Sequence, residues 1–377
     1  MTGRRTRPLL VAAAALALAT GAAACGSSDD NTSSTNGGGG SSSGGGKGGT
    51  IALLLPETKT TRYEEQDKPN FERRVRELCP KCTVIYANAD QDPAKQQDQA
   101  EAAITKGAKV IVMSAVDVKS AAAIVQRANA QGVKVIAYGR LIPNAKIDDY
   151  VSIDPYKVGQ QQARSQMQAL AAKGKKNPRI VMINGAPTDS NAKPYKDGAL
   201  SIYKQQGASI VRSYDTPDWS PDKAQQETEQ TVTSLGKTGF DGVYVANDGM
   251  ATGAVAALQG AGVDPSTQSV TGQDAELTGV QRILAGKQLM TVYQPIIKIA
   301  ETAADLAVPL AQGKKPPANL TPDKVNNGSK VVPSALLDTT AITKDNVNQT
   351  VVKDGYLKVK DICAGSYASA CKAAGVG

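Results

Sequence analysis

Residues 108–139 read AKVIVMSAVDVKSAAAIVQRANAQGVKVIAYG, and this stretch decides the fold class. An apolar run, VIVMSA, is followed by a segment with helical periodicity, KSAAAIVQRANAQG, and then by a second apolar run, VKVIAYG. Two buried strands joined by a helix of this length lie parallel in one sheet, with a right-handed crossover. The stretch therefore predicts a parallel α/β unit.

The same alternation extends to both sides of this stretch. Before it come the strands TIALLL and TVIYAN, each followed by a helical segment, and after YVSID the rhythm restarts with RIVMING, SIVRSY, GVYVAN and SVTGQD. Residues 277–314 add a helix, the strand MTVYQ and a long helix that could return to the first unit. We predict an α/β protein of two lobes, each a parallel sheet flanked by helices, with a ligand in the cleft between them.

The predicted limits follow from this rhythm. The N-terminal lobe comprises 49–154 and 276–316, the C-terminal lobe comprises 155–275 and 317–360, and 361–377 form a C-terminal tail with a disulfide.

The first 48 residues have the pattern of an export signal followed by a flexible tether. Three arginines precede the apolar run 9–20, and small residues come directly before Cys25. This pattern is typical of a lipoprotein signal peptide, here 1–24, with lipidation of Cys25 and anchoring on the outer face of the cell membrane. Plain secretion is the alternative. Residues 25–48 are rich in Ser and Gly and almost without apolar side chains, which predicts a flexible tether.

Composition excludes several classes of function. The chain contains no His, which removes His-based catalysis and His metal sites. The net charge is +8, but the basic residues are scattered and aromatic residues amount to only 4%, so we expect no nucleic-acid partner. No nucleophile has a neighbouring base, and we expect neither an enzyme nor a cofactor or metal.

Besides Cys25, the chain has four cysteines. An even number together with an export signal favours disulfides, and closeness in sequence favours Cys79 with Cys82 and Cys363 with Cys371. A redox pair or a four-thiolate zinc site is the alternative. Redox cysteines lie at the start of a helix, whereas Cys79 follows an amphipathic stretch and precedes a strand.

Polar and aromatic residues follow the predicted strands, at the edge that would face the cleft. Their planar groups suit adjacent hydroxyls, and their aromatic rings suit the apolar face of a sugar. Two acidic residues in these positions have an alternative role that does not involve a ligand. Asp248 could cap the helix that follows it, and Asp189 could start a turn. The candidate ligand residues are Lys59, Arg62, Tyr63, Arg140, Asp189, Asn191, Trp219, Asn247, Asp274 and Gln294.

Several of these residues lie in segments that resemble a known family. The segments include YGRLIPNAKIDDYVSIDPYKVG, GAPTDSNAK, ANDGMATGAVAALQGAG and GQDAELTGVQRILAGKQLMTVYQPI. Over about residues 47–358 the chain resembles the periplasmic D-xylose-binding proteins of ATP-driven sugar importers, within the ribose/galactose-type binding proteins. The resemblance implies a type I periplasmic binding protein fold. It also implies a sugar stacked between Tyr63 and Trp219, with its hydroxyls held by Arg62, Arg140, Asn191, Asn247 and Asp274.

Two positions depart from the xylose pattern. Gly139 stands where those proteins carry Asp, and Gln294 stands where they carry Lys. These departures leave the identity of the sugar open.

Together with the predicted lipidation of Cys25, the resemblance indicates a solute-binding lipoprotein that delivers a monosaccharide to an ABC permease, and we expect it to be a monomer. A sensor that presents its liganded form to a membrane receptor is the alternative. Transcription repressors of the same fold carry an N-terminal DNA-binding unit, and here a leader and a tether take that place.

Overall fold

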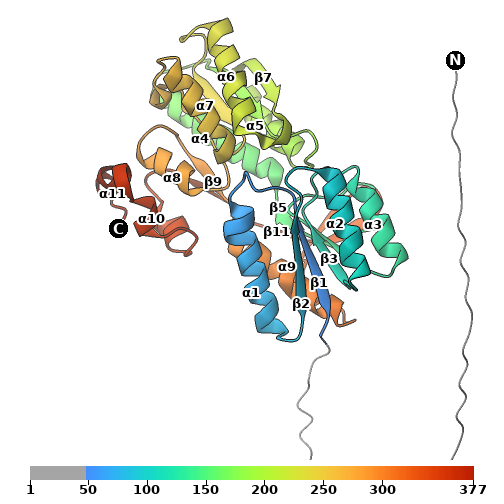
Figure 1. Cartoon of the computed structure of the whole chain (residues 1–377). Coiled ribbons are helices and arrows are strands. Elements are labelled where there is room, and N and C mark those ends of the chain that lie inside the picture. The colour runs from blue at the N-terminus through green and yellow to red at the C-terminus, as the bar shows by residue number, and fades with distance from the viewer. Residues whose placement is uncertain (1–47) are drawn as a thin grey trace, which may run out of the picture. The chain divides into compact units, whose positions relative to one another are not determined.

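The computed structural model describes residues 48–377 (Figure 1). The predicted signal peptide, Cys25 and nearly all of the tether lie outside the described residues. Within residues 48–377, no helix is both long and apolar enough to cross a bilayer.

The first lobe is built on a seven-stranded sheet in the order β10-β11-β5-β4-β3-β1-β2. All neighbouring strands are parallel except β10, which runs antiparallel to β11. Its elements are β1 (Thr50–Leu55), α1 (Lys68–Leu78), β2 (Thr83–Asn88), α2 (Pro93–Thr105), β3 (Val110–Met113), α3 (Ala121–Ala130), β4 (Lys134–Tyr138), β5 (Asp149–Ile153), α9 (Ile296–Ala311), β10 (Asp323–Asn326) and β11 (Val331–Leu337).

Helices cover both faces of this sheet, because the apolar side chains of β1 point alternately to one face and to the other and are buried on both. Successive side chains of a strand point to opposite faces. Ile51 belongs to the same apolar cluster as Phe71 of α1 and Ile299 of α9. Ala52, one residue on, belongs to the cluster formed with α2 and α3, which contains Ile124. The continuous apolar run is therefore the signature of a strand buried on both faces.

The second lobe contains a three-stranded parallel sheet in the order β7-β6-β8 and an antiparallel pair, β9 with β12. Its elements are α4 (Pro155–Ala172), β6 (Arg179–Asn184), α5 (Ala192–Gln205), β7 (Ser209–Asp215), α6 (Pro221–Leu235), β8 (Gly242–Val245), α7 (Asp248–Gly260), α8 (Leu277–Leu284), β9 (Thr291–Tyr293), β12 (Thr340–Ile342), α10 (Val359–Ile362) and α11 (Ala368–Ala373).

The segment SVTGQD, predicted as a strand, does not form one. Thr271 explains the difference, because its side-chain oxygen accepts the Val245 N–H at 2.8 Å and so takes the place of a backbone carbonyl in the ladder. Glutamines of α4 satisfy the carbonyls left over: Gln162 donates to Gly272 at 3.0 Å and Gln166 to Ser269 at 2.8 Å. The chain stays beside β8 without becoming a regular strand.

The structure places two segments differently from the predicted lobe limits. α8 packs on α7, and β9 contacts α4, so residues 277–293 lie with the second lobe and only α9 returns to the first. β10 and β11, expected in the C-terminal lobe, extend the first sheet, because β11 pairs with the free edge of β5. The chain thus passes between the lobes three times: after β5, after β9 and after β11.

The cysteines are bonded in the pairs that closeness in sequence favours, Cys79 with Cys82 and Cys363 with Cys371. The second pair lies in the C-terminal segment, residues 343–377, which follows β12, carries α10 and α11 and packs against α8 through α10. Gln281 of α8 donates to the carbonyls of Asp361 and Ile362 at 3.1 and 3.2 Å.

Candidate functional site

A small cavity lies between the lobes, at the carboxyl ends of the strands. It measures about 40 Å³, room for only a few water molecules, so the walls lie close together in this closed arrangement. Its lining residues come from both lobes and, apart from Gly139, are all buried. They are Thr60, Arg62, Tyr63, Gly139, Arg140, Asn191, Tyr195, Trp219, Asn247, Gln273, Asp274 and Gln294.

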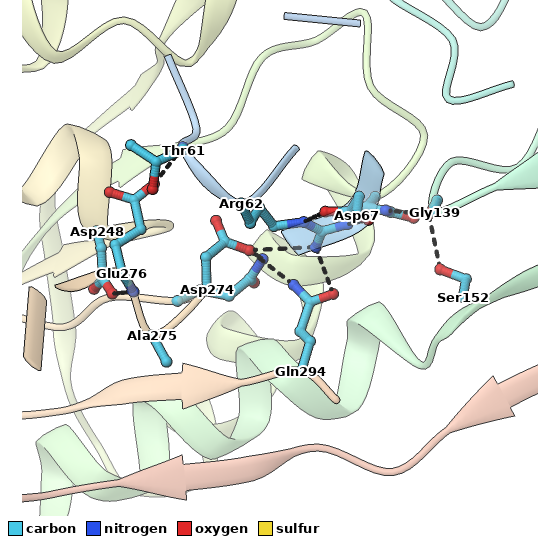
Figure 2. Close-up of polar contacts among 12 residues, drawn as sticks. Thr61, Arg62, Asp67, Gly139, Ser152, Asp248, Asp274, Ala275, Glu276 and Gln294 are labelled. Carbon is cyan, nitrogen blue, oxygen red and sulfur yellow. Dashed lines mark hydrogen bonds and ion pairs between the residues drawn. The ribbon is translucent and has the colours of Figure 1, made fainter. Parts of the chain in front are cut away.

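A single π-helical turn, Tyr63–Asp67, positions Arg62 (Figure 2). The wider turn brings Asp67 back beneath Arg62, and π-turns are frequent at functional sites. The Arg62 guanidinium donates two parallel bonds to the Asp67 carboxylate, at 3.0 and 3.2 Å. Burial lowers the pKa of Arg62, but the neighbouring acidic groups, Asp67 first among them, together outweigh it. The net pKa is well above its ordinary value, and the group stays charged.

Arg62 also reaches two residues of the opposite wall. Its Nη1 donates to Gln294 Oε1 at 3.0 Å and lies 3.6 Å from Asp274 Oδ1. Gln294 Nε2 donates to the same Asp274 oxygen at 3.0 Å, which closes a triangle of polar groups (Figure 2). Burial raises the pKa of Asp274, and the charge of Arg62 opposes this. The triangle leaves the second oxygen of Asp274 for a ligand hydroxyl.

Arg140 forms the second cationic corner of the cavity. Its Nε lies 2.8 Å from Asp189 Oδ2 in the second lobe, and its Nη1 donates to the carbonyl of Ala115 at 2.7 Å. Beside this ion pair, Asn191 Nδ2 donates to the carbonyl of Gly139 at 2.8 Å, again from one lobe to the other. These contacts hold the lobes together directly, in a closed arrangement.

Aromatic rings complete the walls. Trp219 lies edge-on to Tyr195, with ring centroids 6.4 Å apart, and its indole nitrogen has no partner within residues 48–377. The Arg62 guanidinium lies over the Tyr63 ring, 4.9 Å from its centroid. A buried indole N–H without a partner is uncommon, and a ligand oxygen would satisfy it.

A buried carboxylate cluster lies next to the cavity. Asp248 accepts the backbone N–H of Glu276 at 3.0 Å, and Glu276 accepts the backbone N–H of Thr61 across the cleft at 3.3 Å (Figure 2). Burial raises the pKa of Asp248 to about 7. Asn247, not Asp248, is the residue that caps α7, because Asn247 Oδ1 accepts the Met250 N–H.

The comparisons with known proteins agree with this geometry. Residues 51–315 match the model of the periplasmic binding protein domain. The chain belongs to the periplasmic binding protein family.

Similar proteins cover most of the chain. The D-xylose-binding periplasmic protein of Haemophilus influenzae is 36% identical over 310 residues, 81% of this chain and 90% of the relative. The protein of the same name from Escherichia coli is 34% identical, over 83% of this chain and 92% of the relative. An ABC transporter solute-binding protein from Clostridium phytofermentans with bound β-D-glucose has a TM-score of 0.74 and 25% identity, covering 83% of this chain and 99% of that structure.

These matches confirm the fold class and the resemblance that the sequence motifs indicated. The names of the two relatives describe binding proteins, and that of the solved structure describes the solute-binding protein of an ABC transporter; none names an enzyme. The chain is accordingly a binding protein.

Most of the predicted ligand residues of this periplasmic binding protein meet at the cavity. Arg62, Tyr63, Arg140, Asn191, Trp219, Asn247, Asp274 and Gln294 line it. Lys59 does not, because its side chain is exposed, and Asp189 lies behind Arg140 rather than on the wall.

Sequence reasoning missed three wall residues. Thr60 and Gln273 directly neighbour predicted positions, and a wider window around each strand end would have included them. Tyr195 lies one helical turn after Asn191 on α5, and this spacing places both on one face of the helix.

Proposed function

We propose that the protein captures a monosaccharide and delivers it to an ABC permease. The observation that carries the proposal is the cavity between the lobes, in which aromatic rings and paired charged groups converge from both lobes. A ligand that touches both lobes favours the closed arrangement, which a permease can recognise. The names of the relatives support sugar transport.

The electrostatics of the cavity favour a neutral sugar. Each arginine already has a carboxylate of its own, Asp67 for Arg62 and Asp189 for Arg140. With Asp274, which also lies beside Arg62, three carboxyl groups accompany the two arginines, so the site offers strong donors and acceptors without an excess of positive charge. Charge-assisted hydrogen bonds to hydroxyl groups are the interactions that such a wall provides.

Titration of the protein with pentoses, hexoses and small glycosides tests this proposal. Calorimetry and the fluorescence of Trp219 would follow binding, since Trp219 is the only Trp in the chain. We expect one sugar to bind with a Kd at or below the micromolar range. If no sugar of the panel binds, the proposed function is wrong.

We further propose that the ligand differs from xylose at the end of the cavity near Gly139. A Cβ at Gly139 would meet only Ser114 Oγ, at 3.7 Å, so the wall is open there. Gln294 at the same time offers Arg62 an acceptor that a lysine could not. An extra substituent or a changed hydroxyl pattern would fit this space.

The double change Gly139→Asp with Gln294→Lys tests the proposal on specificity. Gly139 has a φ of 71°, which Asp tolerates better than most residues. We expect the variant to bind xylose at least tenfold more tightly, about 1.4 kcal/mol, and to bind the native ligand less tightly. If the unaltered protein already prefers xylose over all other sugars, the proposal on specificity fails while sugar binding stands.

We propose that Cys25 carries the lipid that anchors the protein outside the cytoplasm. The small residues before Cys25 and the long polar tether support this. Cys25→Ser should release the protein from membranes, and fractionation that still requires detergent would contradict lipidation.

We also propose that the protein acts as a monomer, because one chain supplies every lining residue. The sensor alternative predicts that deletion of the gene abolishes signalling but leaves growth on the sugar intact.

A further inference from the structure

Tyr356 of the C-terminal segment touches the ligand site from outside the cavity. It lies between the turn Asn348–Val352 and α10, and its side chain is buried. Its hydroxyl donates to the backbone carbonyl of Asp274 at 3.0 Å, and its ring packs on Tyr293 with centroids 5.1 Å apart. Its own carbonyl accepts from Gln66 Nε2 at 3.1 Å. Tyr356 thus contacts both the Asp274 segment and the π-turn behind Arg62.

The backbone at Asp274 is in a conformation that needs support. Asp274 has a φ of 87° and Ala275 a φ of 50°, which residues other than glycine rarely adopt. Such conformations persist where surrounding contacts over-determine them, and they cluster at binding sites. The strand β9 supplies two of these contacts: the Asp274 N–H donates to Val292 O at 2.9 Å, and the Ala275 N–H donates to Thr291 Oγ1 at 3.2 Å. Tyr356 supplies a third from a remote part of the chain.

We infer that Tyr356 is a positioning residue of the ligand site, through which the C-terminal segment aims the Asp274 carboxylate into the cavity. The segment can do this because it is itself fixed, by the Cys363–Cys371 bond and by Gln281 of α8. The inference rests on the proposed function, since it concerns the same site.

Tyr356→Phe tests the inference, with Tyr244→Phe as a matched control. Tyr244 is also a buried tyrosine of the second lobe, but its hydroxyl has no partner within residues 48–377. We expect Tyr356→Phe to raise the Kd for the bound sugar about fivefold and Tyr244→Phe to leave it unchanged. In an Asp274→Ala background, the effect of Tyr356→Phe should vanish, because Tyr356 acts through Asp274. An equal effect in both backgrounds would overturn the inference.

A measurement without ligand separates this inference from the proposed function. Hydrogen exchange at the backbone amides of Asp274 and Ala275 should accelerate in Tyr356→Phe and stay unchanged in Tyr244→Phe. Unchanged protection in Tyr356→Phe would overturn the positioning role, whatever the ligand is. Failure of every sugar to bind, combined with accelerated exchange, would instead refute the proposed function and leave the role of Tyr356 in holding the turn supported.

Discussion

The ion pair between Arg140 and Asp189 should govern ligand affinity rather than folding stability, because it joins the two lobes. Nε and Oδ2 lie 2.8 Å apart, and both side chains are about 5% exposed. Removing one partner of a buried ion pair destabilises by about 3–5 kcal/mol, because the remaining charge stays buried. Because Asp189 lies on the other lobe, we expect an open cleft to separate the pair and to return Arg140 to water.

Asp189→Asn is the informative change. Asn keeps the oxygen that accepts the Asn191 N–H at 2.8 Å, so the local turn is preserved. Arg140 keeps its bond to Ala115, so we expect a penalty on closure of about 2–3 kcal/mol, less than the full range for a buried pair. Affinity for the bound sugar should then fall roughly 30- to 150-fold. The unfolding free energy without ligand should change by less than about 1 kcal/mol, since the penalty falls on closure.

Asp241→Asn is the matched control, because Asp241 pairs with Arg179 and Lys175 within the second lobe. It should lower the melting temperature and leave the Kd unchanged. Calorimetric titration gives the Kd, and urea unfolding without ligand gives the stability. The reasoning is refuted if Asp189→Asn binds like the unaltered protein, or if it loses as much stability as Asp241→Asn.

Two further predictions follow from the site and its surroundings. Trp219→Ala should weaken sugar binding by at least about tenfold, because a ring of the cavity wall is lost, while the far-UV circular dichroism stays that of the folded protein; wild-type affinity would contradict the place of Trp219 in the site. The pKa of Asp248 is about 7 in the folded protein, above its ordinary value of 3.8. At a pH between these two values the folded protein holds a proton on Asp248 that the unfolded chain has released. This contribution to stability is present at low pH and is lost as the pH rises through about 7, by up to about 1.4 kcal/mol per unit. Urea unfolding at pH 5 and at pH 7.5 should show this loss relative to Asp248→Asn, and identical pH dependence of the two proteins would contradict it.

The local pattern of apolar and polar residues predicted the two lobes and most of the residues that line the cavity. The apolar runs at 50–55 and 110–113 became buried parallel strands, because an uninterrupted apolar run is what two covered faces require. Polar residues that follow the strands of one sheet gather at its carboxyl edge, as Arg62 and Arg140 do in the first lobe; their meeting with Asp274 and Asn191 of the second lobe depends on how the lobes pack. The strands and the polar residues at their carboxyl ends are consequences of periodicity and of spacing along the chain.

Contacts between distant segments decided the rest. The strand β11 joined the first sheet because β5 offered it a free edge, and the pattern of β11 itself does not name its partner. Thr271 replaced a ladder bond with its side chain, which turned a predicted strand into an irregular one. Tyr356 reaches Asp274 across 82 residues of sequence. A sequence determines which segments bury their faces, whereas the choice of partner depends on the hydrogen-bonding groups that other segments leave unpaired once they have packed.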